Sequence, residues 1–286
     1  MVKKILDKRN YIILFIIIIL IIWILFSGKK EYYIKTFNYF DETITISIYD
    51  EVDYKKTTKD INDIFKNYNI NLDSINKYEN NLIEYGIDIY KKSNGYIDIT
   101  SGKLIENLKE EKEYNFKTKI DDIKIKNNKL VNKIDFNFDS IIGSYATKDV
   151  IDYLKENNIK KYIINENGDI TVGDYYSKGK FSLSINNPKT NEVLYIVNLE
   201  NKSMATRNSE GFKSYMVNPK TNKIENKYDS VVVIANDNLT ANMLVNTLYL
   251  MDEKEGKNFI KKYDAEALWI DDEIIKTNGF DKYIKK

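Results

Sequence analysis

The chain has 286 residues, and its 44 Lys and Arg against 43 Asp and Glu leave a net charge of +1. Neither a basic surplus nor an acidic tail is present, so we expect no nucleic-acid partner. The sequence contains no cysteine and no histidine, which excludes Cys and His nucleophiles, His bases, the usual zinc sites and disulfides. Carboxylates, hydroxyls, amides and lysines remain, and their oxygens suit a hard cation such as Mg²⁺.

The N-terminal segment is typical of a membrane anchor. Residues 1–10 form a short basic tail, and Tyr11 to Phe26 is an unbroken apolar run. With Ser27 and Gly28 this run predicts a transmembrane helix over 11–28. A cleaved signal peptide is the alternative, although Phe26-Ser27-Gly28-Lys29 matches its cleavage site poorly. The positive charges before the run predict a cytoplasmic N-terminus and a single-pass cell-membrane protein with an extracytoplasmic body.

Strands and helices alternate after the anchor without a regular βαβ rhythm, which predicts one α+β domain over 32–286. The predicted helices are Thr57–Tyr68, Leu82–Lys92, a central helix after Ser140, Leu239–Met251 and Lys257–Lys262. The predicted strands are Tyr33–Tyr49, Tyr162–Ile164, Phe181–Ile185, Val193–Leu199, Ser214–Val217, Ser230–Ile234 and Ala265–Ile270, with a hairpin of Ile123–Ile125 and Leu130–Ile134 around Asn127-Asn128.

The stretch from Asn137 to Asp174 organises this domain. A polar turn runs directly into the central helix, whose apolar residues recur at three- and four-residue spacing until Asn157 and Asn158 end it. A polar turn at a helix N-terminus offers backbone N–H groups that suit a phosphate or another anion. Most such junctions are ordinary helix caps, and this alternative stays open here.

Seven motifs, in order along the domain, resemble those of the FAD:protein FMN transferases, the ApbE family. Asp73-Ser74 with Asn80 is similar to its DSxxSxxN segment, and residues 95–102 are similar to its GxFDPTxG motif. Residues 137–146 stand where the family has DLGGIAKGYA. The other four matches are Asn165 with Gly168-Asp169 (NxGGD), residues 203–206 (ALATS), residues 215–222 (HIIDPRTG) and residues 241–249 (ADALATALF).

The resemblance implies a membrane-anchored enzyme that uses Mg²⁺ to move FMN from FAD onto a Thr or Ser of a target protein, with release of AMP. It also implies FAD contacts at Ile97, Asp98, Asn137, Gly143, Thr206 and Val217. Implied metal ligands are Ser140, Asn242 and Asn246, and Asp139 is a further candidate for a carboxylate ligand. No catalytic residue is assigned.

Several departures from the family pattern fall on these positions. Gly143 replaces a Lys or Glu that contacts the nucleotide. Asn242 and Asn246 replace an Asp and a Thr that hold the metal, and an amide oxygen carries no formal charge. We therefore expect a weak or absent Mg²⁺ site. The other departures are Asn137 for Asp, Asp139 and Ser140 for two glycines, Tyr215 for His and Asn218 for Asp.

Each candidate residue also has an ordinary structural explanation. Asp98 suits a turn cap, Asp169 suits a turn, and Thr206 suits a strand hydroxyl. Asn242 and Asn246 suit a solvated or partner-facing side of their helix. Three hypotheses therefore remain: an active flavin transferase, a non-catalytic member that binds a flavin nucleotide or a partner protein, and a domain that keeps only the fold.

Overall fold

The computed structural model describes residues 32–175, 179–209 and 216–286, and Tyr33–Lys286 forms one compact unit. The predicted anchor over 11–28 lies outside the described residues, as does Tyr215. Within these three ranges, no helix has the length and apolar character needed to cross a membrane. The anchor and the location therefore stay predictions.

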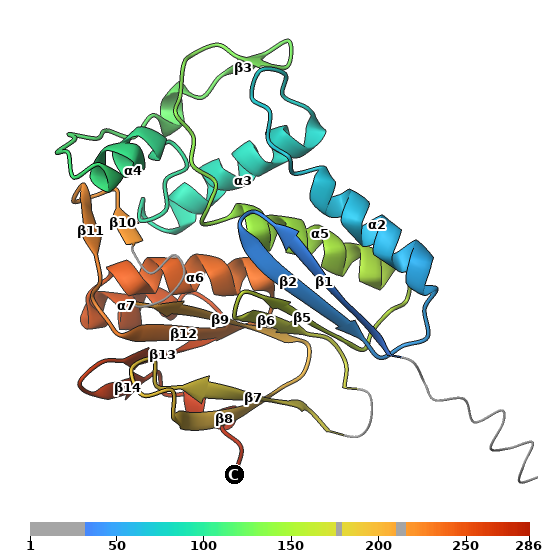
Figure 1. The fold of residues 1–286 in the computed structure, drawn as a ribbon. Helices are drawn as coiled ribbons and strands as arrows, with labels where there is room; N and C mark the ends of the chain where they lie inside the picture. The colour runs from blue at the N-terminus through green and yellow to red at the C-terminus, as the bar shows by residue number, and fades with distance from the viewer. Residues whose placement is uncertain (1–31, 176–178, 210–215) are drawn as a thin grey trace, which may run out of the picture. The chain divides into compact units, whose positions relative to one another are not determined.

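An antiparallel sheet of eight strands forms the centre of the domain (Figure 1). Consecutive neighbours pair antiparallel throughout, which confirms the mixed α+β class. In sheet order the strands are β1 (Tyr33–Tyr39), β2 (Glu42–Ile48), β5 (Tyr162–Glu166), β6 (Asp169–Val172), β9 (Lys202–Asn208), β12 (Ser230–Ala235), β13 (Ala265–Ile270) and β14 (Ile274–Lys276).

The prediction of one strand over Tyr33–Tyr49 is wrong, because this segment is the hairpin of β1 and β2. Its two-residue turn is Phe40-Asp41, and both residues have a positive φ, at 58° and 56°. Two positive φ values are the mark of the tight turns that suit the strand twist, and Asn-Gly usually provides them. Phe-Asp carries no such sequence signal, so the turn was missed.

Helices cover one face of the sheet and a strand hairpin covers the other (Figure 1). The helices α2, α5 and α6 pack above the sheet, and α7 packs on α6 and β13. The hairpin of β7 and β8 lies on the opposite face with the C-terminal segment. The elements outside the sheet are α2 (Tyr54–Lys66), α3 (Lys77–Lys92), α4 (Gly102–Lys109), α5 (Ile142–Glu156), α6 (Asn238–Leu250), α7 (Glu253–Ile260), β3 (Ile125–Lys126), β4 (Lys129–Leu130), β7 (Phe181–Asn186), β8 (Val193–Leu199), β10 (Met216–Asn218), β11 (Lys223–Glu225) and the short 3₁₀ turns Ile120–Asp122 and Phe280–Lys282.

Strand β12 is buried on both faces, which explains its unbroken apolar sequence. Val231 and Val233 belong to the core beneath the helices, whereas Val232 and Ile234 belong to the core beneath the β7–β8 hairpin. A strand with one solvated face would alternate apolar and polar residues. The two cores therefore meet at β12 and fix the sheet in the middle of the domain.

The central helix follows the prediction closely. It begins at Ile142 and ends where Asn157 caps it, and Asn158 takes a positive φ of 57° that ends the turn. The sequence does not predict helix α4 or the strands β6, β9, β11 and β14. The hairpin around Asn127-Asn128 is confirmed, although its strands are only two residues long.

Candidate functional site

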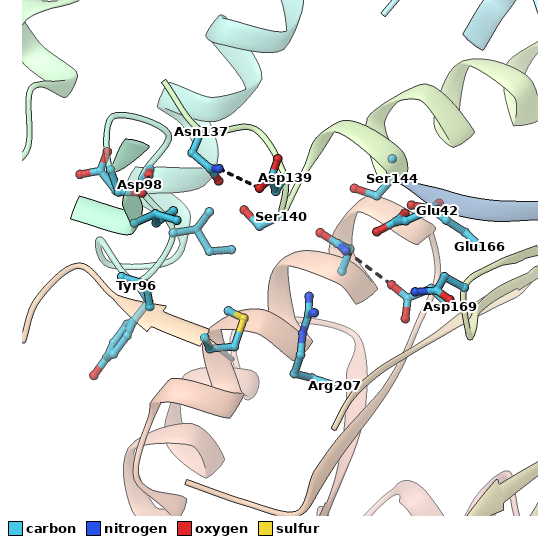
Figure 2. A pocket seen from close by; sticks show the side chains of 18 of the residues that line it. Glu42, Tyr96, Asp98, Asn137, Asp139, Ser140, Ser144, Glu166, Asp169 and Arg207 are labelled. Atoms are coloured by element: carbon cyan, nitrogen blue, oxygen red, sulfur yellow. Dashed lines mark hydrogen bonds between the residues drawn. The ribbon is translucent and has the colours of Figure 1, made fainter. Parts of the chain in front are cut away.

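A cavity of about 290 Å³ lies at the start of α5 and α6, above the ends of β5, β6 and β9 (Figure 2). Its walls come from segments far apart in the sequence. Figure 2 shows Asp98 and Asn137 on one side, Arg207 in the middle, and Glu42, Glu166 and Asp169 on the other side.

Most of the residues singled out in the sequence meet in this cavity. The lining includes Ile97, Asp98, Asn137, Asp139, Ser140, Gly143, Thr206, Val217 and Asn242. Asn246 is different, because its side chain is fully buried (0% exposed) and, in the part of the chain that the structure describes, does not line the cavity. The resemblance therefore located the cavity, and the structure adds residues that the motifs did not indicate.

Asp98 is buried (5% exposed) and uses only one of its carboxylate oxygens within the protein. Its Oδ1 accepts hydrogen bonds from the backbone N–H and the hydroxyl of Thr100, each at 2.7 Å. Its Oδ2 is buried too, and no donor among the described residues reaches it. A turn cap explains the first oxygen alone. An unpaired buried carboxylate oxygen is costly, so the second one points to a ligand that donates an N–H or O–H group.

The polar turn before α5 packs against the segment that carries Asp98. The backbone N–H of Asn137 donates to the carbonyl of Ile99 at 2.8 Å, and its side-chain amide donates to Asp139 at 2.9 Å. The N-cap residue of α5 is Ile141, which has no side chain able to cap the helix. Gly143 and Ser144 in the first turn line the cavity, so the positive end of the helix dipole faces it.

Three acidic residues form the opposite wall, and the sequence did not reveal two of them. Glu42 and Glu166 close on Gly143 so tightly that an added Cβ there would lie 2.2 Å from Glu166 Oε1 and 2.8 Å from Glu42 Oε2. Burial raises the pKa of Glu166 well above its usual range, and the nearby Glu42 and Asp169 raise it further. Thr147 donates to the other Glu166 oxygen at 2.7 Å.

Asp169 closes the Asn167-Gly168 turn by pairing with Glu166, as expected of a turn residue, and its side chain also forms part of the cavity wall. Asp169 begins β6, and its side chain connects β9 to α6: it accepts from the backbone N–H of Thr206 at 2.8 Å and from Asn242 at 3.5 Å. Burial raises its pKa to about 6, and the Thr206 N–H, Arg207 and Asn242 only partly offset this. Its carboxyl therefore stays protonated to a higher pH than that of an exposed aspartate.

The expectation that the asparagines of α6 lie on a solvated or partner-facing side of the helix is wrong, because that side is buried within the domain. Asn238, Asn242 and Asn246 recur at four-residue spacing and form one polar stripe that faces α5 and β9. Asn238 donates to the carbonyl of Ser144 at 2.6 Å. Asn246 accepts from Nε of Arg207 at 3.0 Å and also from its Nη2.

The ApbE family model matches residues 40–269 of the chain. Among solved structures, the flavin transferase ApbE from Vibrio cholerae is similar with a TM-score of 0.73 and 17% identity, over 88% of this chain and 99% of that one. The ApbE protein from Thermotoga maritima is similar with a TM-score of 0.75 and 16% identity, over 90% of this chain and 100% of that one. The flavinyl transferase ApbE from Pseudomonas stutzeri is similar with a TM-score of 0.70 and 17% identity, over 89% of this chain and 98% of that one.

These identities are low, so the solved structures establish the fold and leave the activity to be argued from the site. A search of curated proteins finds no match for the chain. The family model and the solved structures nevertheless agree with the order of motifs found in the sequence.

Proposed function

Because the chain belongs to the ApbE family, we propose that it binds FAD in the cavity of Figure 2 and transfers the FMN half to a Thr or Ser of a target protein. The convergence of the sequence-predicted contacts on one cavity, with the unpaired Asp98 Oδ2 in its wall, carries this proposal. FAD offers hydroxyl and N–H donors for that oxygen and a pyrophosphate for the helix N-terminus.

The transfer breaks one bond of the pyrophosphate. The hydroxyl oxygen of the target attacks the phosphorus of the FMN half, the bond from that phosphorus to the bridging oxygen breaks, and AMP leaves with that oxygen. The hydroxyl proton is lost to solvent or to a carboxylate of the cavity. Negative charge grows on the departing phosphate, so positive groups at the cavity assist the step. Arg207 and the first turn of α5 supply such groups here.

A second candidate is a member that binds the nucleotide without transferring FMN. It is favoured by the substitutions at the positions implied to hold the metal, since Asn242 and Asn246 provide no carboxylate. Tyr215, where the family motif has histidine, removes a further candidate proton acceptor from that position.

The location belongs to the proposal as well. The apolar run Tyr11–Phe26 supports a single-pass anchor with the domain outside the cytoplasm. A target protein at the same face of the membrane would then present its Thr or Ser to the mouth of the cavity.

The test combines a binding and a turnover measurement on the full-length chain. Calorimetry with FAD reports binding, and AMP release in the presence of a peptide that contains Thr and Ser reports transfer. Binding with AMP release and flavin covalently attached to the peptide supports the transferase. Binding without either product supports the second candidate, and an absence of binding contradicts both.

A further inference from the structure

Arg207 lies on β9 at the place where the implied metal ligands meet. Its register partner in the sheet is Val231, so its position is set by the centre of the sheet. The guanidinium reaches α6 and donates to Asn246 Oδ1 from both Nε and Nη2. In the family motif ALATS, the residue after the threonine is serine, which is too short to make this contact.

The Arg207 guanidinium fixes the orientation of the Asn246 side-chain amide. Arginine has donors only, so the amide must turn its oxygen toward Arg207. Its nitrogen then faces the other side, where it donates to the carbonyl of Ser140 at 3.4 Å and to Asn242 Oδ1 at 3.3 Å. Three oxygens that a metal could use are therefore each engaged by an N–H group: Asn246 Oδ1, Asn242 Oδ1 and the Ser140 carbonyl.

These residues do not fit Mg²⁺. The ion demands oxygen ligands in near-octahedral geometry and is normally held through at least one carboxylate. Asp139, the candidate substitute, instead accepts a hydrogen bond from Asn137 in its own turn. The carboxylates of Glu42, Glu166 and Asp169 in the opposite wall are not arranged so that they could hold a metal ion, and the three described ranges contain no other group of three acidic side chains that could. A permanent positive charge beside the site would also repel a divalent cation.

We infer that Arg207 replaces the divalent metal ion in this chain, so that the protein binds the phosphate groups of its nucleotide without Mg²⁺. A guanidinium offers five N–H donors in a planar fork that matches phosphate oxygens, and Asn246 receives bonds from only two of its nitrogens. Arg207 lines the same cavity as Gly143 and Ser144 of the first turn of α5, so both positive groups face the same space. This inference rests on the proposed nucleotide binding.

The decisive measurement is the dissociation constant of FAD for the full-length chain, by calorimetry, in buffer with EDTA and in buffer with millimolar Mg²⁺. We expect equal values in the two buffers. Arg207→Met, which keeps the length of the side chain and removes its charge, should weaken binding about tenfold or more in both buffers, equal to about 1.4 kcal/mol. The FAD dissociation constant of Arg207→Lys should lie between those of the wild type and Arg207→Met. Thermal unfolding of each variant checks that it folds.

Matched variants test whether Arg207 closes the metal site. Arg207→Ser combined with Asn242→Asp and Asn246→Thr restores the residues of the family motifs, and its FAD binding should become about tenfold or more tighter with Mg²⁺ than with EDTA. The double variant Asn242→Asp with Asn246→Thr keeps Arg207 and should show no such gain.

The binding measurements separate the inference about Arg207 from the proposed function. Wild-type binding that disappears in EDTA overturns the inference and leaves the proposed function intact. Wild-type binding in neither buffer overturns both. An Arg207→Met variant that binds FAD like the wild type, or a double variant that gains Mg²⁺ dependence while Arg207 is present, overturns the inference. Should Arg207→Met fail to fold, the comparison of the two buffers on the wild type still decides.

Discussion

Glu166 Oε1 occupies the space into which any side chain at position 143 would have to extend, 2.2 Å from where a Cβ would stand. The family pattern has a long polar residue at this position, and here Gly143 leaves its volume to the carboxylates of Glu166 and Glu42. The space that a side chain from α5 would fill is thus taken up by carboxylates from β2 and β5 in this chain.

We expect Gly143→Ala to destabilise the domain. Helix propensity alone would stabilise it by up to about 1 kcal/mol. Glu166 is buried and accepts a hydrogen bond from Thr147, so its carboxylate cannot move aside freely, and overpacking against it costs about 1–3 kcal/mol. Chemical denaturation of the wild type and the variant measures the difference. In a Glu166→Ala background the same substitution should cost less, because the obstructing carboxylate is gone. An equal cost in both backgrounds would show that Glu166 does not set the limit at position 143.

Asp98→Asn should weaken FAD binding about tenfold without unfolding the domain. The amide keeps one oxygen for the two hydrogen bonds from Thr100, but its nitrogen cannot accept a bond from the ligand. Loss of a hydrogen bond to a charged group costs about 1.5–3 kcal/mol. The control is Asp121→Asn, which removes the same charge at an exposed position outside the cavity. The idea fails if both variants bind FAD equally well.

The stability of the domain should depend on Asp169 between about pH 4 and pH 6. Its pKa rises from 3.8 to about 6 on folding, so the folded state binds more protons across this window. The free energy of unfolding therefore falls as the pH rises through it. Partial solvent access at the cavity limits the loss to about 1–2 kcal/mol.

The measurement is the difference in thermal stability between the wild type and Asp169→Asn at several pH values. Asparagine retains an oxygen for the Thr206 N–H and cannot titrate. The difference between the two proteins should change across pH 4–6 and stay constant above it. A difference that is flat over the whole range would rule out a raised pKa at Asp169.

The predicted anchor is tested by topology. The run Tyr11–Phe26 predicts that the full-length protein sediments with membranes and that protease added to intact, wall-stripped cells digests the body. Protection of the body would mean the reverse orientation. A body found free in the medium, with a new N-terminus near Gly28, would mean that the segment is a cleaved signal peptide.

The sequence predicted the fold class and the cavity because those depend on features that it displays directly. Apolar spacing gave the central helix almost to the residue, since Asn157 and Asn158 end it by local backbone preference. The motif order brought Asp98, Asn137 and Thr206 to one cavity. Local preferences and ordered motifs are properties of the chain itself, so no tertiary contact was needed to recognise them.

Arg207 and Glu42 escaped prediction because their importance comes from tertiary contacts. Glu42 sits in a strand that alternates like any half-buried strand, and only its approach to Gly143 and Glu166 gives it a place in the cavity. Arg207 follows a recognised motif by one position, so its departure from the serine of ALATS was the available signal. The role of Arg207 depends on its hydrogen bonds to Asn246, which lies on α6, and the sequence does not show this contact.

The pairing of β2 with β5 has a consequence for the order in which the domain folds. Ile44 pairs with Glu166, and Ile46 pairs with Ile164. The β1–β2 hairpin is synthesised early, so β2 cannot complete its pairing until β5 has been synthesised much later. Contacts between such distant segments form slowly, because a long loop must close first. Until then the backbone edge of β2 that pairs with β5 has no hydrogen-bond partner. During this interval the unpaired edge is a template on which another chain could pair, so β2 is a place where incompletely folded copies of the protein associate.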